Sequence, residues 1–512
     1  MQGSWMERVM LLAAVVLPVA GGLSGRLEWR RAGVALSWAA AASAVALLIV
    51  TAATGHSATV GGGTGAGLTG GPLSAFFLVL VTGVGAVVSS YASRYLQSDP
   101  TRDRFAGWVG VVVTAMAAVA AAASVGGLVA GWLVAGAAFS VVAGLRTDLP
   151  GVTACQRSLR RTLGLGDASL LAAAAIIWAE AGDASLSPAS LSAAVHHLGD
   201  WRPVVASLVV VAALTRCAQA VFGKWLPMTV SAPTPACALL HAGVVNGGGM
   251  LLLRFGPLGV WGPAMVALLM VAGATAVAAA IAAAAQPDVK GQLAFSTMSQ
   301  MGFMLAECAV GAYGAAALHL AGHGAYKASL FLASGSTVSR PGRPSLAAGS
   351  RSRGVVPALV AGAAAAAAAA PGTARGDGAV LTGFSAATAL ALAWGFFAGR
   401  DRAPAAGARG LLWPAVLVGT AAGYGALVAS VGRFVSGGLV DGSAAPSVWW
   451  LGAVGGGGLL AAAAARSRRW GPTVRAWALD AAAAPPAAPL RRVPSGEAAT
   501  AWTLSPSTAV AA

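Results

Sequence analysis

Residues 235–255 have the sequence PACALLHAGVVNGGGMLLLRF, an apolar stretch with one histidine and a run of three glycines. A helix of this length, at ~1.5 Å per residue, crosses the ~30 Å of hydrocarbon in a bilayer. Similar stretches recur along the whole chain. We predict fifteen membrane-spanning helices, at about 9–23, 33–53, 72–92, 106–123, 125–145, 165–181, 203–223, 235–255, 259–285, 291–312, 314–338, 354–370, 379–399, 410–432 and 447–466.

The composition of the whole chain supports a membrane protein. Of 512 residues, 57% are hydrophobic and 9% are charged, and the mean hydropathy is +0.75. An ordinary soluble domain is about 25% charged, so polar residues here are too few to cover a soluble globule. We therefore predict an all-α polytopic membrane protein. We expect Val9–Leu23 to be a retained first helix rather than a signal peptide, and residues 467–512 to form a disordered tail.

The charge distribution predicts the orientation in the membrane. The net charge of +16 comes from 32 Lys and Arg against 16 Asp and Glu. Loops rich in Arg alternate along the chain with neutral or acidic loops, as the positive-inside rule requires. The alternation places the N-terminus outside and the C-terminus in the cytoplasm. Three of the basic residues are lysines: Lys224, Lys290 and Lys327.

Several classes of function are excluded by missing motifs. The four cysteines are scattered and define neither a disulfide framework nor a zinc cluster. The sequence has no phosphate-binding loop, no dinucleotide fingerprint and no basic-aromatic pattern for nucleic acid. We expect a transport subunit rather than an enzyme, without a cofactor of its own.

Polar residues inside the apolar stretches are the candidates for function, because a charge within a span costs several kcal/mol unless it is paired or hydrated. We place Arg216 two-thirds along the span at 203–223, and Asp167 at the start of the span at 165–181. The other candidates are His241 with Asn246, Glu307, His319, His323 and Lys327.

The sharpest pattern joins His319, His323 and Lys327, which are spaced i, i+4, i+8. On a helix these side chains form a polar ladder ~12 Å long on one face. Imidazole and amine groups on one stripe suit a proton relay. The alternatives are a structural hydrogen-bonding face and a zinc site, but the HxxxH spacing lacks an evident third ligand.

His241 and Glu307 have open alternatives. His241 is either a core histidine satisfied by a carbonyl or part of a broken helix, which the glycines after it favour. Glu307 pairs with Arg216 or a histidine, or faces a lumen. His196, His197 and His56 are expected at the surface.

Three motifs resemble elements of a known family. RCAQAVFGKWLPMTVSAPTPACALLHAGVVNGGG (Arg216 to Gly249) resembles a signature of the antiporter-like membrane subunits of respiratory complex I. QPDVKGQLAFSTMSQMGFML (Gln286 to Leu305) and AALHLAGHGAYKASLFLASGS (Ala316 to Ser336) resemble two further elements of that family, which also includes Mrp-type cation/proton antiporter subunits.

The resemblance implies about fourteen to fifteen helices, with two inverted five-helix repeats and broken helices. On this basis residues 1–105 hold N-terminal helices, 106–400 the antiporter-like core and 401–466 C-terminal helices. The implied ion path maps onto Arg216, His241, Lys290, His319, His323 and Lys327, and possible charge partners are Asp167, Glu307 and Asp288.

One branch fits best, the DabB-type subunit of an inorganic-carbon uptake complex. LLHAGVVNGGGMLLLRFGPL (Leu239 to Leu258) and HGAYKASLFLASGS (His323 to Ser336) resemble it, and the chain ends soon after the last predicted span, before any long lateral helix. The resemblance implies a soluble, zinc-binding, carbonic-anhydrase-like partner (DabA-like), with cation flow driving CO2 hydration. The alternatives are a proton-translocating subunit of an NADH:quinone oxidoreductase-type complex, an Mrp-type antiporter subunit and a degenerate structural paralogue.

The sequence departs from the family at two points in the first half. The family's glutamate after a tryptophan is Leu133, and its lysine is Arg216, which stays charged and cannot relay a proton. A second-repeat lysine beyond Lys327 is also missing. We therefore expect ions to use the path of His241, Lys290, His319, His323 and Lys327, with Arg216 as a fixed charge. The coupling ion, H+ or Na+, is left open.

Overall fold

The computed structural model describes residues 3–26, 30–61, 67–146, 151–182, 185–256 and 262–335, with isolated residues in 426–434 and 472–476. The four spans predicted within 354–466 and the predicted tail fall almost wholly outside these residues. Within them, nine segments are long and apolar enough to cross a membrane. The prediction of an all-α polytopic membrane protein is thus confirmed.

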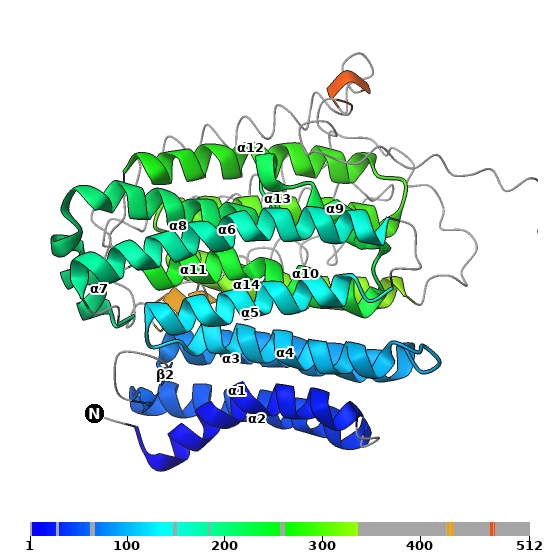
Figure 1. Cartoon of the computed structure of the whole chain (residues 1–512), viewed down its shortest axis with the longest axis horizontal. Coiled ribbons are helices and arrows are strands. Elements are labelled where there is room, and N and C mark those ends of the chain that lie inside the picture. Colours follow the sequence, from blue (N-terminus) through cyan, green and yellow to red (C-terminus); the bar gives the residue numbers. More distant parts are fainter. Residues whose placement is uncertain are drawn as a thin grey trace, which may run out of the picture.

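Long helices occupy ten of the eleven spans predicted up to residue 338, and the span at 235–255 holds two shorter helices. Figure 1 shows the helices running side by side, with α1 and α2 at one edge and α12 at the other. The N-terminal group comprises α1 (Trp5–Arg26), α2 (Arg30–Thr54), α3 (Pro72–Tyr95), α4 (Arg102–Ala121) and α5 (Val125–Ala143). The remaining long helices are α6 (Val152–Ala181), α8 (Arg202–Arg216), α12 (Pro263–Ala285), α13 (Val289–Ala309) and α14 (Tyr313–Ser334). Shorter helices are α7 (Pro188–Leu198), α9 (Trp225–Met228), α10 (Thr234–Ala242) and α11 (Gly247–Phe255).

Small residues let α1 and α4 approach closely. A Cβ on Gly110 of α4 would lie 2.5 Å from the backbone oxygen of Pro18 in α1. Pro18 interrupts the hydrogen bonding of α1, and the next amide, of Val19, donates to Thr114 Oγ1 of α4 at 3.0 Å. In a bilayer core such a backbone group has no water to bond, so the neighbouring helix must satisfy it.

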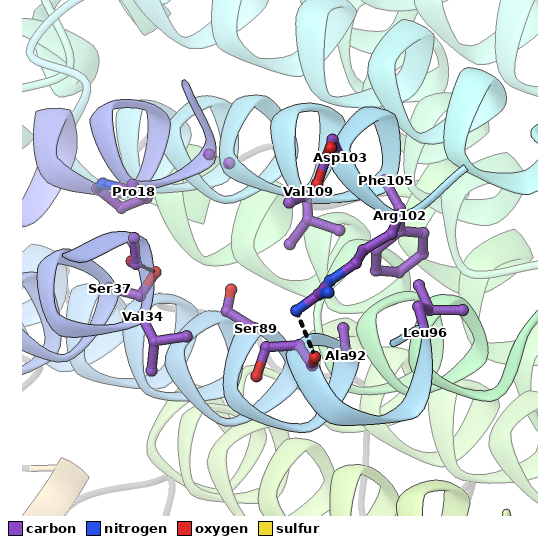
Figure 2. A pocket seen from close by; sticks show the side chains of 16 residues that line it. Pro18, Val34, Ser37, Ser89, Ala92, Leu96, Arg102, Asp103, Phe105 and Val109 are labelled. Atoms are coloured by element: carbon purple, nitrogen blue, oxygen red, sulfur yellow. Dashed lines mark hydrogen bonds between the residues drawn. The ribbon is translucent and has the colours of Figure 1, made fainter. Parts of the chain in front are cut away.

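A small cavity of about 50 Å³ lies among the first four helices. Figure 2 shows Arg102 reaching across it from α4 toward α3, where its Nη2 donates to the backbone oxygen of Ser93 at 2.8 Å. Nearby, Arg146 after α5 forms an ion pair of 2.6 Å with Asp99 between α3 and α4. Burial would raise the pKa of Asp99, but hydrogen bonds from Thr101 and Arg146 outweigh it and hold this pKa below its usual value.

A two-stranded antiparallel hairpin fills part of the uncharged loop predicted at 54–71. Strands β1 (Ala58–Val60) and β2 (Leu68–Gly70) pair in the register Ala58↔Gly70. An isolated bridge from Leu68 to Ala122 attaches the hairpin to the end of α4.

Two predicted helix boundaries are wrong, and both matter for the site. The sequence placed Asp167 at the start of a helix at 165–181, but α6 begins at Val152, so Asp167 lies in mid-helix. The exposed part of the first half of α6 includes Arg157, Arg160 and Arg161, which lie between two of the predicted spans. The helix starts early because buried side chains at positions 152, 155, 159 and 163 repeat with helical periodicity opposite the arginines.

The span predicted at 203–223 is also shorter than expected. Helix α8 ends at Arg216, so this residue is terminal rather than two-thirds along a continuous helix. Ala218 then adopts a positive φ of 53°, which L-residues rarely do, and the chain continues through the short helices η2 (Ala220–Phe222) and α9. The amide of Ala220 donates to Thr275 Oγ1 in the middle of α12. The break therefore lies inside the bundle.

A matched pair of alanine substitutions tests the packing of α1 on α4. Gly110→Ala should lower the thermal unfolding temperature in detergent, because its methyl group collides with the backbone of α1; overpacking of this kind costs about 1–3 kcal/mol. Gly83→Ala in α3 is the control, since its Cβ would meet no atom within 4 Å. Equal unfolding temperatures for the two variants would contradict the contact.

Candidate functional site

Arg216 is a fully enclosed charge of the candidate site. Its side chain is 1% exposed and lies at the end of α8, with its Cζ 3.9 Å from the ring centroid of Trp132 in α5. Nη2 donates to the backbone oxygen of Trp132 at 3.1 Å and to Asp167 Oδ1 of α6 at 3.2 Å. A guanidinium with a stacked aromatic ring and a carboxylate is held as a fixed charge.

Asp167, one of the possible charge partners predicted from the sequence, is thus the partner of Arg216. Leu133 leaves α5 without a carboxylate at the position after Trp132, and α6 supplies it instead. Gly136 makes room for this arrangement, because a Cβ there would lie 3.3 Å from Arg216 Nη2. The side chain of Asp167 is 19% exposed, so the pair reaches from the interior toward the outer face of α6.

The second helix break follows His241. Helix α10 ends at Ala242, Gly243 has φ −124° and ψ −73°, and η4 (Val244–Asn246) leads into α11. The prediction of a broken helix here is confirmed. The two breaks touch, because Cys217 Sγ lies 3.3 Å from the backbone oxygen of Val245. Non-helical backbone from two spans therefore meets inside the bundle, where it is shielded from lipid.

His241 faces α14 across this break. Its side chain is fully buried, and its ring stacks on Phe331 with a centroid distance of 4.3 Å. Phe331 lies one helical turn beyond Lys327 on α14, so His241 approaches the end of the polar ladder.

The ladder on α14 has three different environments. Lys327, 1% exposed, donates its Nζ to the backbone oxygen of Leu293 in α13 at 3.1 Å. His323 is 6% exposed, and its ring centroid is 6.3 Å from that of His319. His319 is partly exposed and lies nearer the start of the helix. Lys327 thus lies in the interior, and the ladder becomes more accessible toward His319.

His319 bridges α14 and α13. Its Nδ1 lies 2.9 Å from Glu307 Oε2, and its Nε2 lies 3.0 Å from Gln300 Oε1. Of the partners considered for Glu307, the structure selects a histidine rather than Arg216. Glu307 itself is 1% exposed, so its carboxylate depends on His319 for a partner.

Lys290 lies at the opposite end of α13 from Glu307. Its Nζ is 3.4 Å from the backbone oxygen of Val230 and 3.3 Å from that of Ala232. Asp288, considered as a charge partner, instead caps α13, accepting from the amide of Gly291 at 2.6 Å. At ~1.5 Å per residue, Lys290 and Glu307 are about 25 Å apart along α13.

Sequence reasoning missed Arg254, although it lies within the stretch at 235–255. Its side chain is 7% exposed, and its Nη2 contacts Ser74 Oγ of α3 at 2.7 Å and the backbone oxygen of Ala120 near the end of α4. Charged residues inside membrane spans often mark functional sites, so Arg254 was a candidate on the same grounds as Arg216. Gln300 was missed as well, because nothing in the sequence marks it as the neighbour of His319.

His196 and His197 are exposed as expected, but they belong to α7 rather than to a loop. Ser187 caps this helix by accepting a hydrogen bond from the amide of Ser190 at 3.1 Å. Lys224 is exposed beside α9. None of these three basic residues contributes to the buried set described above.

Two models of known protein families match this chain. Residues 122–369 match the family model of the NADH:quinone oxidoreductase/Mrp antiporter transmembrane region. Residues 66–106 match the model of the N-terminus of complex I chain 5.

Two curated relatives are a probable inorganic carbon transporter subunit DabB1 of Halothiobacillus neapolitanus and an NADH-quinone oxidoreductase subunit L of Mycobacterium tuberculosis. The first is 32% identical over 52% of this chain and 49% of its own length. The second is 31% identical over 52% of this chain and 42% of its own length. The matched regions thus span about half the length of these relatives or less.

Among solved structures, a chain in the Mrp complex from Dietzia sp. DQ12-45-1b has a similar fold. The TM-score is 0.57 at 27% identity, covering 93% of this chain and 52% of that chain. The two family models, the relatives and this structural likeness agree. The chain belongs to the antiporter-like membrane subunits shared by complex I-type and Mrp-type complexes.

Proposed function

We propose that this chain is the cation-conducting membrane subunit of a complex that takes up inorganic carbon, as CO2 or bicarbonate. The observation that carries the proposal is the series of polar side chains along α13 and α14, which we propose to form an ion route. From Lys290 it passes to Lys327, whose Nζ bonds the carbonyl of Leu293 one turn beyond Lys290 on α13. It then continues through His323 and His319 to Glu307.

This route covers most of a bilayer. The ~25 Å between its ends on α13 compares with ~30 Å of hydrocarbon. Buried ionisable residues are expensive in a membrane and mark ion pathways when they form a series. Both H+ and Na+ are compatible with the proposal.

Arg216 has a different role in this proposal. Its guanidinium remains protonated and is tied to Asp167 and Trp132, so it sets the local potential and does not itself pass a proton. His241, which stacks on Phe331 beside the ladder, joins the route from α10.

The choice of inorganic carbon rests on the curated relatives. Besides DabB1, the chain is 33% identical over 347 residues to a probable inorganic carbon transporter subunit DabB2 of the same bacterium. We propose that a soluble, zinc-binding, carbonic-anhydrase-like subunit docks on this chain and holds the zinc. We further propose a bacterial cell (inner) membrane location, with the N-terminus outside and the C-terminus in the cytoplasm.

The second candidate function is ion translocation in an NADH:quinone oxidoreductase-type or Mrp-type complex. The relative named NADH-quinone oxidoreductase subunit L and the Mrp fold likeness favour it. Co-purification separates the candidates, because the inorganic-carbon complex requires a soluble zinc protein, the NADH:quinone oxidoreductase-type complex requires redox subunits and the Mrp-type complex requires several small membrane subunits.

The route is tested by growth of a carbonic-anhydrase-deficient host at ambient CO2, with this chain and its soluble partner co-expressed. Lys327→Met and His323→Gln should each lower carbon uptake at least tenfold, because each removes a buried group of the route while keeping its size. Arg160→Gln, an exposed substitution on α6, is the control.

Full uptake by both Lys327→Met and His323→Gln would refute the route. Absence of rescue by the wild-type pair would refute the inorganic-carbon assignment itself. Membrane levels of every variant are measured by immunoblot, so that lost uptake is not confused with lost protein.

A double-mutant cycle tests the Asp167–Arg216 pair. Asp167→Asn should destabilise the protein by about 3–5 kcal/mol, because it leaves a guanidinium buried without its carboxylate. Asp167→Asn combined with Arg216→Gln should cost less than the sum of the two single changes. Thermal unfolding temperatures in detergent provide the measurement, and strict additivity would show that the pair is not coupled.

A further inference from the structure

Buried polar atoms without a partner gather at the second helix break. Among the residues that the structure describes, both ring nitrogens of His241, Asn246 Oδ1 and His323 Nε2 are enclosed and accept or donate no hydrogen bond within the protein. All three side chains are at least nine-tenths buried, with 0%, 1% and 6% exposure respectively. Leaving each such atom unsatisfied would cost about 1–3 kcal/mol.

Asn246 adjoins the segments that bear the two histidines. Its Nδ2 donates to the backbone oxygen of Ala242, the residue after His241, at 2.9 Å. On α14, a Cβ on Gly324, the residue after His323, would lie 3.3 Å from the same Nδ2 and 2.9 Å from that carbonyl. The amide thus adjoins both histidine-bearing segments, and glycine at 324 is what permits this approach.

The break adds backbone groups to this cluster. Helix α10 stops at Ala242, so the carbonyls of its last turn lack the full set of intrahelical donors. Unsatisfied polar side chains in an enclosed site are the surroundings in which proteins hold ordered water, which makes two to four hydrogen bonds.

We propose that Asn246 is a positioning residue of the ion path, whose amide holds water that links the imidazoles of His241 and His323. This proposal rests on the proposed function, because these residues form an ion path only if the chain conducts cations. The water itself is inferred from the unsatisfied atoms and does not depend on that function. It joins α10 to the ladder of α14.

The other buried amide at a break has a different setting. Gln219, 0% exposed, donates its Nε2 to the carbonyls of Cys217 and Met298, and its Oε1 faces Gly302 of α13. It therefore lies on the α13 side of the first break and does not flank a histidine of α14. Asn246 is the amide that the geometry assigns to the His241–His323 link.

Radiolytic hydroxyl-radical footprinting of the purified full-length protein tests for the water directly, because bound water yields radicals beside enclosed side chains. In the wild type, His241 and His323 should be modified although both are buried, at rates several times that of the equally enclosed Phe77. Asn246→Leu, which keeps the volume and removes the amide, should lower both rates to that of Phe77. Asn246→Ser, which keeps an oxygen, should restore them.

Carbon uptake in the carbonic-anhydrase-deficient host supplies the second measurement. Asn246→Leu should reduce uptake at least tenfold and Asn246→Ser should recover most of it. Thr82→Val is the matched control, since Thr82 is a buried hydroxyl on α3 whose hydrogen bond goes to the carbonyl of Leu78. This control should change neither footprint nor uptake.

The outcomes are separable. Unmodified His241 and His323 in the wild type would overturn the water, even if Asn246→Leu failed to fold. Modified histidines with full uptake by Asn246→Leu would overturn the role of Asn246 in the path. Modified histidines with no uptake by the wild type would leave the water in place and refute the proposed function instead.

Discussion

The ion pair between Arg216 and Asp167 is the interaction on which the centre of the bundle depends. A guanidinium that is 1% exposed must have its charge met by protein, since no water reaches it in a bilayer core. Meeting it requires α5 for the tryptophan ring and carbonyl, α6 for the carboxylate and α8 for the arginine. Gly247 of α11 completes the enclosure, because a Cβ there would lie 3.4 Å from Arg216 Cγ. Four helices are thus positioned by one side chain.

The two helix breaks follow from the same constraint. A chain that leaves the helix inside a membrane must satisfy its backbone against other parts of the protein. Here the breaks at 217–223 and 243–246 lie against each other, linked by the contact between Cys217 and Val245. Placing them together confines irregular backbone to one region, beside Arg216 on one side and His241 on the other. The polar interior of the protein is organised around this region.

The two sides of this region differ in chemistry. Toward α6 the charge is a guanidinium locked to a carboxylate, which cannot release its proton. Toward α14 the groups are an amine and imidazoles, which can exchange protons. Within the described residues, the hydrogen-bond partner of Lys327 is a backbone carbonyl. His319 instead contacts a carboxylate and a side-chain amide. The charges capable of moving are therefore concentrated on α13 and α14.

The sequence alone determined the membrane class, the approximate positions of the helices up to residue 338 and the ladder of His319, His323 and Lys327, because hydropathy and the spacing of four are properties of local chain geometry. It also marked the break after His241, through its glycines. Only the tertiary structure decided that Arg216 pairs with Asp167 and Glu307 with His319. The residues of these pairs are 49 and 12 positions apart in the sequence. The packing of helices decides which candidate partners meet, and no local sequence pattern encodes that packing. The early start of α6 was missed because its exposed arginines lower the hydropathy of a segment whose other face is buried. The end of α8 was missed because the positive φ of Ala218 depends on support from neighbouring helices.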